Sequence, residues 1–316
     1  MSDPAIDRAV ELLCSGQLVG MPTETVYGLA GNALDPLAVA RIFELKARPH
    51  FDPLIVHAGE AEQALSYASQ VPPEARLLAE RFWPGLLTLI LQKRPCIPDL
   101  VSSGMPTVAL RVPAHPTALA LLRAFGGPLA APSANRFGRI SPTRAEHVRA
   151  EFGEALSCVL DGGPCQLGVE STIVSLCGER PCLLRPGALA LEELEALVGP
   201  LLVPSADPKH PLAPGQLPSH YAPRTPMRLA ELASASFAPG QRVGALSVGP
   251  MKPAQGYARV EVLSEPLDLR RAAAELFAAM HRLDDAGLDL ILAELTLDEG
   301  LGRAINDRLI RASQRT

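Results

Sequence analysis

Short apolar runs alternate with helical patterns over the first two thirds of the chain. Apolar runs of the length of a buried strand occur at 18–21, 54–57, 86–91, 107–112, 129–131, 159–160, 171–176 and 182–185. Apolar residues recur at helical spacing at 6–15, 35–48, 61–68, 73–82, 115–125, 143–152 and 191–198. Because strands and helices are interleaved, the pattern predicts an α/β domain with a twisted, mixed sheet.

One of these predicted helices carries two cations to its C-terminal end. Asp35 is a capping residue, Pro36 suits the first turn, and Pro49 ends the pattern. Lys46 and Arg48 therefore lie together where the helix stops. Cations at this end also complement the helix dipole, so the position alone does not indicate a site.

The last third of the chain shows a different organisation. Residues 203–226 are rich in proline and have no periodicity, which is typical of an extended linker. Beyond them, strand patterns at 243–248, 260–263 and 290–295 alternate with helical patterns at 269–283 and 301–312. We therefore expect a large α/β domain (1–202), a linker (203–226) and a smaller, Rossmann-like α/β domain (227–316).

The composition is that of a globular protein without a membrane span. The 316 residues are 47% hydrophobic and 20% charged, and no apolar run reaches the ~18 residues of a membrane helix. The first residues show no secretory signal, so we expect a cytoplasmic protein. The six cysteines form no CxxC pair and have no metal-ligand spacing with histidine, which favours reduced, buried thiols.

The net charge of −5 is unevenly distributed. Residues 203–316 carry equal numbers of basic and acidic side chains, so the whole deficit lies in residues 1–202. An acidic domain is a poor non-specific nucleic-acid binder, because phosphate neutralisation supplies most of that affinity. A few basic residues in one cleft are still compatible with a single polyphosphate.

Common nucleotide-binding and hydrolytic motifs are missing from the sequence. The chain has no Walker-type phosphate loop, and Gly28-Leu-Ala-Gly31 is too short for a dinucleotide fingerprint. It also has no HExxH spacing. A bound nucleotide would therefore be held by side chains and turns outside these motifs.

Cations at the ends of predicted elements form a first candidate site. Besides Lys46 and Arg48, Arg111 ends one apolar strand and Arg185 ends another, just before a Pro-Gly turn. Charged side chains are costly at such half-buried positions unless an anion meets them. Together the four cations are a candidate cradle for a polyphosphate or a carboxylate.

Polar residues at other strand ends can serve either a ligand or the local structure. These residues are His57, Ser133, Asn135 and Ser171. Each is compatible with an ordinary role, as a core histidine, a Ser-x-Asn turn or the punctuation of a hairpin. In the linker, Gly215, His220 and Tyr221 do not serve solubility, which argues against a passive spacer.

A series of short motifs gains meaning from its order and spacing. They are Pro22-Thr-Glu-Thr-Val-Tyr-Gly28, Lys46-x-Arg48-Pro, Asp52-Pro-Leu-Ile-Val-His57, Phe82-Trp-Pro-Gly85, Thr107-Val-Ala-Leu-Arg111, Ala131-Pro-Ser-Ala-Asn135 and Gly168-Val-Glu-Ser-Thr172. They continue with Arg185-Pro-Gly, His220-Tyr-Ala-Pro223 and Gly300-Leu-Gly-Arg-Ala-Ile-Asn-Asp-Arg308. In this order they resemble the YrdC/Sua family over nearly the whole chain, in its long, two-domain form.

The resemblance implies a fold and an activity. The fold would be a YrdC-like α/β domain with a concave, cationic cavity. The activity would be that of a nucleotidyltransferase that joins L-threonine, bicarbonate and ATP, with Mg²⁺, into threonylcarbamoyl-adenylate and releases pyrophosphate. A separate transferase complex would then modify an adenosine of tRNA. Two alternatives remain open: a double-stranded RNA-binding module without synthesis, and carbamoyl transfer from carbamoyl phosphate.

Position by position, the resemblance also implies roles for individual residues. L-threonine would be held by Thr25, His57, Arg111, Ser133 and Ser171. ATP would be surrounded by Arg48, Asp52, Thr107, Asn135, Ser141, Thr143, Arg185 and Tyr221. Lys46 and Arg48 would support catalysis, and Tyr221 would reach the cavity because the linker folds over it as a lid.

The chain departs from the family pattern at three places. Asp52 stands where asparagine is common, which puts a negative charge near the expected triphosphate. The loop after Asn135 reads Arg-Phe-Gly where a small residue and Ser-Gly are usual. The linker sequence Ala213-Pro-Gly-Gln-Leu-Pro-Ser replaces a customary Pro-Gly-Met-basic-Tyr run, so we expect lid closure to differ in detail.

Overall fold

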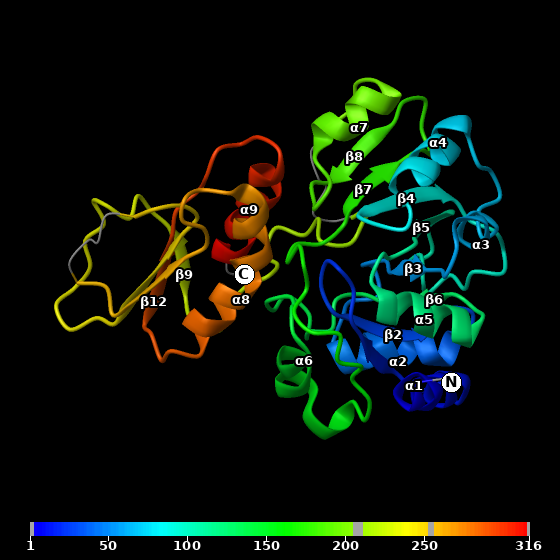
Figure 1. The fold of residues 1–316 in the computed structure, drawn as a ribbon, viewed down its shortest axis with the longest axis horizontal. Helices are drawn as coiled ribbons and strands as arrows, with labels where there is room; N and C mark the ends of the chain where they lie inside the picture. Colours follow the sequence, from blue (N-terminus) through cyan, green and yellow to red (C-terminus); the bar gives the residue numbers. More distant parts are fainter. Residues whose placement is uncertain (1–2, 205–210, 252–255, 315–316) are drawn as a thin grey trace.

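The computed structural model describes residues 3–204, 211–251 and 256–314. Two sheets form the centres of two domains that lie side by side (Figure 1). No helix among these residues is long and apolar enough to cross a membrane. The predicted α/β class with a second, smaller domain is therefore confirmed.

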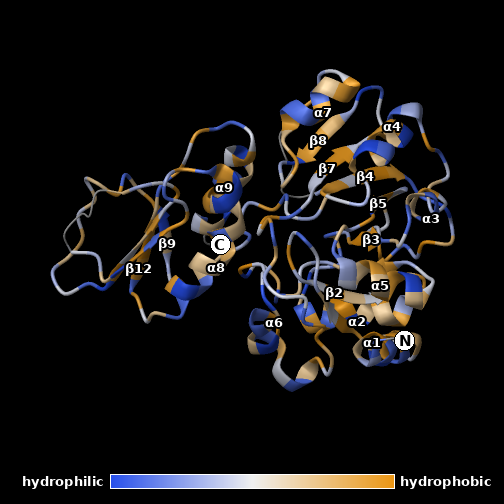
Figure 2. Ribbon diagram, in the orientation of Figure 1, coloured by the Kyte–Doolittle hydropathy of each residue, from blue (hydrophilic) through white to orange (hydrophobic). Residues whose placement is uncertain are grey.

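The large domain is built on an eight-stranded mixed sheet. Its strands, in spatial order, are β1 (Val19–Met21), β2 (Gly28–Asn32), β6 (Leu129–Ala130), β3 (Ile55–His57), β5 (Thr107–Arg111), β4 (Leu87–Gln92), β7 (Thr172–Ser175) and β8 (Cys182–Arg185). Two neighbouring pairs, β3 with β5 and β4 with β7, are parallel, and the other pairs are antiparallel. These strands are mostly hydrophobic, whereas the surface helix α6 is mostly hydrophilic (Figure 2).

Helices pack around this sheet, and the bounds of the one that begins after Asp35 follow the sequence signals closely. They are α1 (Pro4–Cys14), α2 (Pro36–Lys46), α3 (Ala61–Leu65), α4 (Pro73–Phe82), α5 (Pro116–Phe125), α6 (Ala145–Phe152) with a 3-10 turn at Gly153–Ala155, and α7 (Leu191–Val198). As expected, the Asp35 side chain caps α2 by accepting from the Leu37 N–H, with Pro36 in the first turn. The helix ends at Ala47 in the left-handed conformation, which turns the chain toward Arg48.

The two faces of the central strands have different neighbours. Val56 of β3 and Leu110 of β5 belong to the main hydrophobic core, together with residues of α2, α4 and α7. Because side chains alternate along a strand, Ile55 and Ala109 point to the opposite face. There they pack with Ala213 of the linker instead of a helix. The linker, and not a helix, therefore covers this face of the sheet, and the candidate site lies on the same face.

The C-terminal domain contains a four-stranded parallel sheet. Its order is β11 (Arg259–Val262), β10 (Val243–Ser247), β12 (Leu290–Ala293) and β9 (Met227–Leu229). Its two helices are α8 (Leu269–Asp284) and α9 (Leu301–Ser313), and they face the large domain (Figure 1). The expected parallel, Rossmann-like arrangement is confirmed.

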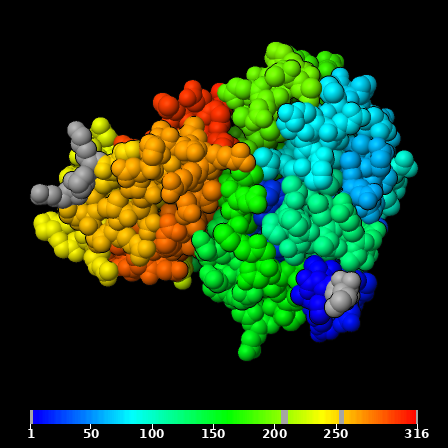
Figure 3. Space-filling view, in the orientation of Figure 1, coloured from blue at the N-terminus to red at the C-terminus, as the bar shows by residue number. Residues whose placement is uncertain are grey.

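The two domains share one hydrophobic cluster. Val26, Ile140 and Val169 of the large domain pack with Tyr221 of the linker and with residues of α8 and α9 such as Phe277. A space-filling view shows the C-terminal residues closely applied to the large domain (Figure 3). At Gly168 an added Cβ would lie 2.4 Å from the carbonyl oxygen of Ala274 in α8, so only glycine permits this approach. The domains are therefore packed against each other without a gap at this point.

Some sequence expectations need correction. Residues 159–160 form no strand, because Val159 makes only a single bridge to Gly20. Strands β2 and β9 were not expected from the pattern. The cysteines are less buried than expected, since Cys14 and Cys96 are exposed and only Cys165 is fully buried.

Candidate active site

A cavity lies on the face of the large sheet that the linker covers, where strands end and loops begin. It encloses about 540 Å³ of empty space, a volume that includes open solvent. Its lining consists of Thr23, Thr25, Val26, Gly28, Arg48, Ile55, His57, Arg111, Ala131, Pro132, Ser133, Glu170, Ser171, Arg185, Pro214, Gly215, His220 and Tyr221. The pairing of β3 with β5 places His57 beside Arg111 at one end of the strands. The lining therefore combines residues that are far apart in the sequence.

Arg48 lies at the cavity with its charge partly neutralised. Its Nη2 atom is 2.8 Å from the Asp52 carboxylate, and its guanidinium also donates to the carbonyl oxygens of Asp52 and Pro53. The carboxylate has no aligned hydrogen bond, so this contact is an ion pair only. Burial raises the pKa of Asp52 despite the positive charge of Arg48 beside it. Asp52 is thus the internal counterion of Arg48 and does not line the cavity.

Lys46 is placed differently from Arg48. Its ammonium donates to the carbonyl oxygen of Ser133 at 2.6 Å and to that of Asn135, and it is 1% exposed. Burial and the positive charge of Arg48 lower its pKa well below the usual value. Lys46 is not part of the cavity lining, and in this structure it holds the loop that carries Ser133.

Arg111 is held in a fixed orientation by three different groups. Its Nε donates to the Gly85 carbonyl and its Nη1 to the Thr25 hydroxyl, both at 3.0 Å. Its Nη2 pairs with the buried carboxylate of Glu24, which also accepts from the Ala114 N–H. A guanidinium has five N–H donors, so two remain for a ligand in the cavity.

His57 lines the cavity beside Arg111 as a neutral imidazole. Burial and the positive charge of Arg111 lower its pKa to about 3. Its Nδ1 atom is buried and has no hydrogen-bond partner among the described residues. With so low a pKa, His57 is a poor general base but can still contact a ligand.

The buried state of His57 predicts a pH dependence of stability. A histidine whose pKa is depressed in the folded state contributes stability that is present above its unfolded pKa of 6.5 and is lost as pH falls toward about 3. Within this window its contribution has a slope of about 1.4 kcal/mol per pH unit. We expect urea unfolding between about pH 7 and pH 5 to show a steeper loss in the wild type than in His57→Asn. Equal slopes would contradict a buried, neutral His57.

Arg185 enters the cavity from the end of β8. Its guanidinium donates to the Ser171 carbonyl at 2.8 Å, to the Ser171 hydroxyl at 3.2 Å and to the Pro214 carbonyl at 3.1 Å. The Ser171 hydroxyl also lies 2.7 Å from that of Thr88. No carboxylate pairs with Arg185 within the described ranges. Burial lowers its pKa, because removing a charge from water is costly.

The linker closes the cavity on the side opposite the sheet. Tyr221 is 1% exposed and lies in the left-handed region at φ 63°, which is rare for a residue other than glycine. Burial raises the pKa of its phenol to about 12. An added Cβ at Gly215 (φ 82°) would lie 2.6 Å from the Tyr221 hydroxyl, so glycine is required at this contact.

The buried charges of the described residues do not balance. The buried cationic side chains are Lys46, Arg48, Arg111, Arg185 and Arg308, and the buried carboxylates are Glu24, Asp52 and Glu170. Two cations, Lys46 and Arg185, have no carboxylate partner within the described ranges. Burial lowers the pKa of Lys46, Arg48 and Arg185, which means that their charged forms are incompletely compensated. An anionic ligand would supply the missing charge.

Unpartnered polar atoms cluster in the same region. Within the described ranges, buried side-chain atoms without a hydrogen-bond partner occur on Asp52, His57, Ser103, Asn135, Thr143, His220, Tyr221 and Arg308. Five of these eight residues, Asp52, His57, Asn135, Thr143 and Tyr221, were assigned to ligands by the sequence resemblance. Buried polar atoms are nearly always paired in proteins, so this concentration indicates a ligand site.

The predicted ligand residues divide into two groups. All residues expected to hold threonine line the cavity, as do Arg48, Arg185 and Tyr221. The other residues expected at ATP do not line it; they are Asp52, Thr107, Asn135, Ser141 and Thr143. Thr107 lies on the same face of β5 as Ala109, which packs with Ala213 of the linker. The linker therefore covers part of the surface expected to meet ATP.

Sequence reasoning missed two carboxylates of the site. Glu24 lies inside the first motif and binds Arg111, and Glu170 lies in the motif at Gly168–Thr172 and lines the cavity. Both belong to quoted motifs, but their arginine partners are 87 and 138 residues away in the sequence. The positions of Glu24 and Glu170 inside the motifs could have identified them as site residues. Their pairing with distant arginines could not be predicted from the sequence.

Fold and site together define an α/β protein with a buried cationic cavity suited to a small anionic ligand. The family model Sua5/YciO/YrdC, described as "Telomere recombination", matches residues 11–187. A second model, described as "Threonylcarbamoyl-AMP synthase, C-terminal domain", matches residues 189–314. The chain belongs to the Sua5/YciO/YrdC family in its two-domain form, which confirms the resemblance seen in the sequence.

Similar proteins cover nearly the full length of the chain. A threonylcarbamoyl-AMP synthase of Bacillus subtilis is 41% identical over 99% of this chain and 94% of its own length. One of Pyrococcus abyssi is also 41% identical, over 96% of this chain and 93% of its own. The crystal structure of P. abyssi Sua5 complexed with L-threonine superposes with a TM-score of 0.91 at 41% identity, covering 98% of this chain and 94% of that chain.

Proposed function

We propose that the protein is an L-threonylcarbamoyladenylate synthase, a nucleotidyltransferase that makes threonylcarbamoyl-AMP and pyrophosphate from L-threonine, bicarbonate and ATP. The observation that carries this proposal is the excess of buried cations over carboxylates around a cavity lined by the expected threonine residues. The names of the full-length relatives and the threonine bound to P. abyssi Sua5 support it.

The threonine end of the site would be at Arg111 and His57. The two unused donors of the Arg111 guanidinium suit a bidentate contact with the amino acid's carboxylate. The hydroxyls of Thr25, Ser133 and Ser171, together with the unpaired Nδ1 of His57, offer polar contacts for the rest of the substrate. Such contacts would favour an amino acid that carries a hydroxyl group.

The ATP end would be at Arg48 and Arg185. Both lack full compensation of their charge, so they suit phosphate oxygens. The linker segment that covers Ala109 would have to move before the adenine base of ATP could enter. This agrees with the expected role of the linker as a lid. Lys46 would act indirectly, by fixing the loop that carries Ser133 and Asn135.

Magnesium would enter together with ATP. The described residues contain no group of three or more His, Cys, Asp or Glu side chains placed to hold a metal. The Asp52 carboxylate is paired with Arg48, and both Glu170 oxygens accept hydrogen bonds. The chain thus fits a Mg·ATP substrate whose ion is bound by phosphate oxygens, while its own arginines face the remaining charge.

In the reaction, the threonine amine would add to CO₂ derived from bicarbonate and lose a proton, giving a carbamate. A carbamate oxygen would attack the α-phosphorus in line, forming the new P–O bond as the bond to pyrophosphate breaks. The contribution of the protein would be positioning and charge stabilisation by Arg48 and Arg185. The low pKa of His57 gives no general base at this histidine, so the amine proton would pass to solvent or substrate.

The RNA-binding alternative gains no support from the site. The cations that distinguish this domain are buried, at most 6% exposed, and therefore do not form the exposed basic surface that a duplex would need. The expected downstream steps, transfer of the threonylcarbamoyl group by a separate complex to tRNA in the cytoplasm, remain part of the proposal.

The proposal is tested by measuring pyrophosphate release from ATP with the purified protein. Release should require both L-threonine and bicarbonate, and the adenylate should carry carbon from both. Release that persists when either is omitted would overturn the synthase assignment. Salt-sensitive binding of double-stranded RNA, without threonine-dependent release, would favour the alternative instead.

A further inference from the structure

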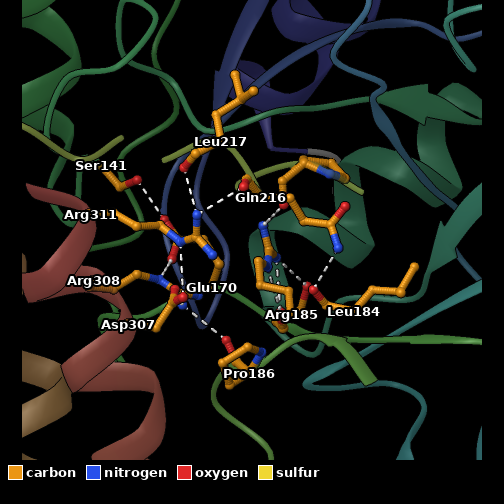
Figure 4. Close-up of polar contacts among 12 residues, drawn as sticks. Ser141, Glu170, Leu184, Arg185, Pro186, Gln216, Leu217, Asp307, Arg308 and Arg311 are labelled. Atoms are coloured by element: carbon orange, nitrogen blue, oxygen red, sulfur yellow. Dashed lines mark hydrogen bonds and ion pairs between the residues drawn. The ribbon is translucent and has the colours of Figure 1, made fainter. Parts of the chain in front are cut away.

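Helix α9 of the C-terminal domain brings three charged residues to the wall of the cavity. Figure 4 shows Asp307, Arg308 and Arg311 pointing from α9 toward Glu170 and the linker. Arg308 is 0% exposed, although it belongs to a different domain from the residues that it meets. Arg311 donates to the carbonyl oxygens of Gln216 and Leu217, which ties the linker to the same helix.

Arg308 makes contacts in two directions. Its Nε donates to one Glu170 oxygen at 2.8 Å, while the other Glu170 oxygen accepts from the Ser141 hydroxyl at 2.6 Å. Its Nη1 donates to the Pro186 carbonyl at 3.0 Å. Its guanidinium carbon lies 5.1 Å from the centre of the Tyr221 ring, within cation–π distance. One side chain thus holds both the cavity wall and the linker.

The conformation of Tyr221 depends on these contacts. A non-glycine residue in the left-handed region persists only where its surroundings hold it. The Tyr221 ring contacts Arg308 and also Phe277, whose ring centre is 5.5 Å away. Both partners belong to the C-terminal domain. That domain therefore supplies part of the contacts that keep Tyr221 at the cavity, beside those of Val26, Ile140 and Val169 from the large domain.

The residues that Arg308 reaches share one expected ligand. Arg308 contacts Tyr221 directly and reaches Ser141 through Glu170. The sequence resemblance assigned both Tyr221 and Ser141 to ATP. In contrast, the polar contacts of Arg308 include none with Thr25, His57 or Arg111 at the threonine end. The two ends of the cavity are therefore held by different parts of the protein.

We propose that Arg308 is a positioning residue for ATP, acting through Glu170 and Ser141 on one side and through Tyr221 on the other. The C-terminal domain then supports one wall of the synthase site from behind, because Arg308 contacts the lining residues Glu170 and Tyr221 without lining the cavity itself. This inference rests on the proposed function, because it takes ATP as the ligand of Ser141 and Tyr221. Arg308 does not line the cavity, and its charge is paired with Glu170 and Asp307. It therefore acts through its neighbours, although its buried Nη2 has no hydrogen-bond partner among the described residues.

The test compares ligand binding in Arg308→Met and the wild type by calorimetry, with Mg·ATP and L-threonine titrated separately. We expect the affinity for Mg·ATP to fall about tenfold, while the affinity for L-threonine changes by less than about twofold. Arg303→Met is the matched control, because Arg303 lies on the same helix and pairs across the domains with Glu192 at the surface. It should bind both ligands as the wild type does. An equal loss of both affinities in Arg308→Met would overturn the inference.

A second comparison separates positioning from simple charge balance. Arg308→Met leaves Glu170 unpaired, which by itself can destabilise the fold. The double variant Arg308→Met/Glu170→Gln removes that unpaired charge and should recover thermal stability. We expect it to bind Mg·ATP about tenfold more weakly than Glu170→Gln alone, because the support of Tyr221 is still missing. Equal ATP affinities of these two proteins would show that Arg308 only neutralises Glu170.

The outcomes also separate this inference from the proposed function. If the wild type binds Mg·ATP but releases no pyrophosphate in response to threonine, the synthase assignment fails, and the binding comparison still decides the role of Arg308. If the wild type is an active synthase and Arg308→Met keeps its ATP affinity, the inference fails alone. Absence of Mg·ATP binding by the wild type would overturn both.

Discussion

Replacing Arg48 with methionine should lower threonine-dependent pyrophosphate release by roughly 10³-fold, the range seen when one charge-stabilising group is removed from a site of this kind. Arg48 lines the cavity and is one of the two arginines that we propose to meet the phosphates. Methionine keeps much of the side-chain volume, so the effect reports the lost charge and its hydrogen bonds. The measurement is single-turnover formation of pyrophosphate with saturating L-threonine and bicarbonate.

The control for this prediction is substitution of Asp52, the ion-pair partner of Arg48. Removing Arg48 leaves the buried Asp52 carboxylate without its ion pair, which costs about 3–5 kcal/mol of stability. Asp52→Asn removes that charge and should stay active, because asparagine is compatible with the family pattern and Asp52 does not line the cavity. The double variant Arg48→Met/Asp52→Asn should be folded but inactive. Recovery of activity in the double variant would show that Arg48 serves only to neutralise Asp52.

The sequence predicted the fold well where elements are long and apolar. The interleaved order of strands and helices, the cap of α2 at Asp35 and the parallel C-terminal sheet are all present. Strand β2 was missed because Gly28-Leu-Ala-Gly-Asn has the composition of a turn. Its glycines are needed for close packing, since a Cβ at Gly31 would lie 2.8 Å from the Leu18 side chain. A close approach of this kind is a property of the packed sheet and is not visible in the sequence.

The site was predictable in its composition but not in its pairing. The motifs contained every buried cation of the large domain. They did not reveal that Arg48 is paired with Asp52, or that Lys46 donates to backbone carbonyls and does not line the cavity. Arg308 stood at the end of the last motif, yet its role depends on Glu170 in the other domain. Which charges are compensated is decided by domain packing, and this determines which cations remain for a ligand.

Replacing Arg111 with methionine should raise the concentration of L-threonine needed for half-maximal pyrophosphate release by about 10²-fold or more, since truncating one partner of a buried, hydrogen-bonded charge pair costs 2–5 kcal/mol. Three of its donor directions are used by Gly85, Thr25 and Glu24, which fixes the plane of the guanidinium. The remaining donors are therefore preorganised for a carboxylate. The half-saturating concentration of ATP should change much less, because Arg48 and Arg185 at the other end are untouched.

Two further variants distinguish recognition of threonine from support of the fold. Arg111→Lys keeps the positive charge beside Glu24 but cannot form two parallel hydrogen bonds, so it should also bind threonine weakly while remaining folded. Arg111→Met/Glu24→Gln removes the buried pair without leaving an uncompensated charge, and glutamine can still accept from the Ala114 N–H. Wild-type threonine saturation in Arg111→Lys would show that a point charge suffices. Wild-type saturation in the double variant would remove Arg111 from the threonine site altogether, and the carboxylate would then have to be bound by the backbone and hydroxyl groups around Ser133.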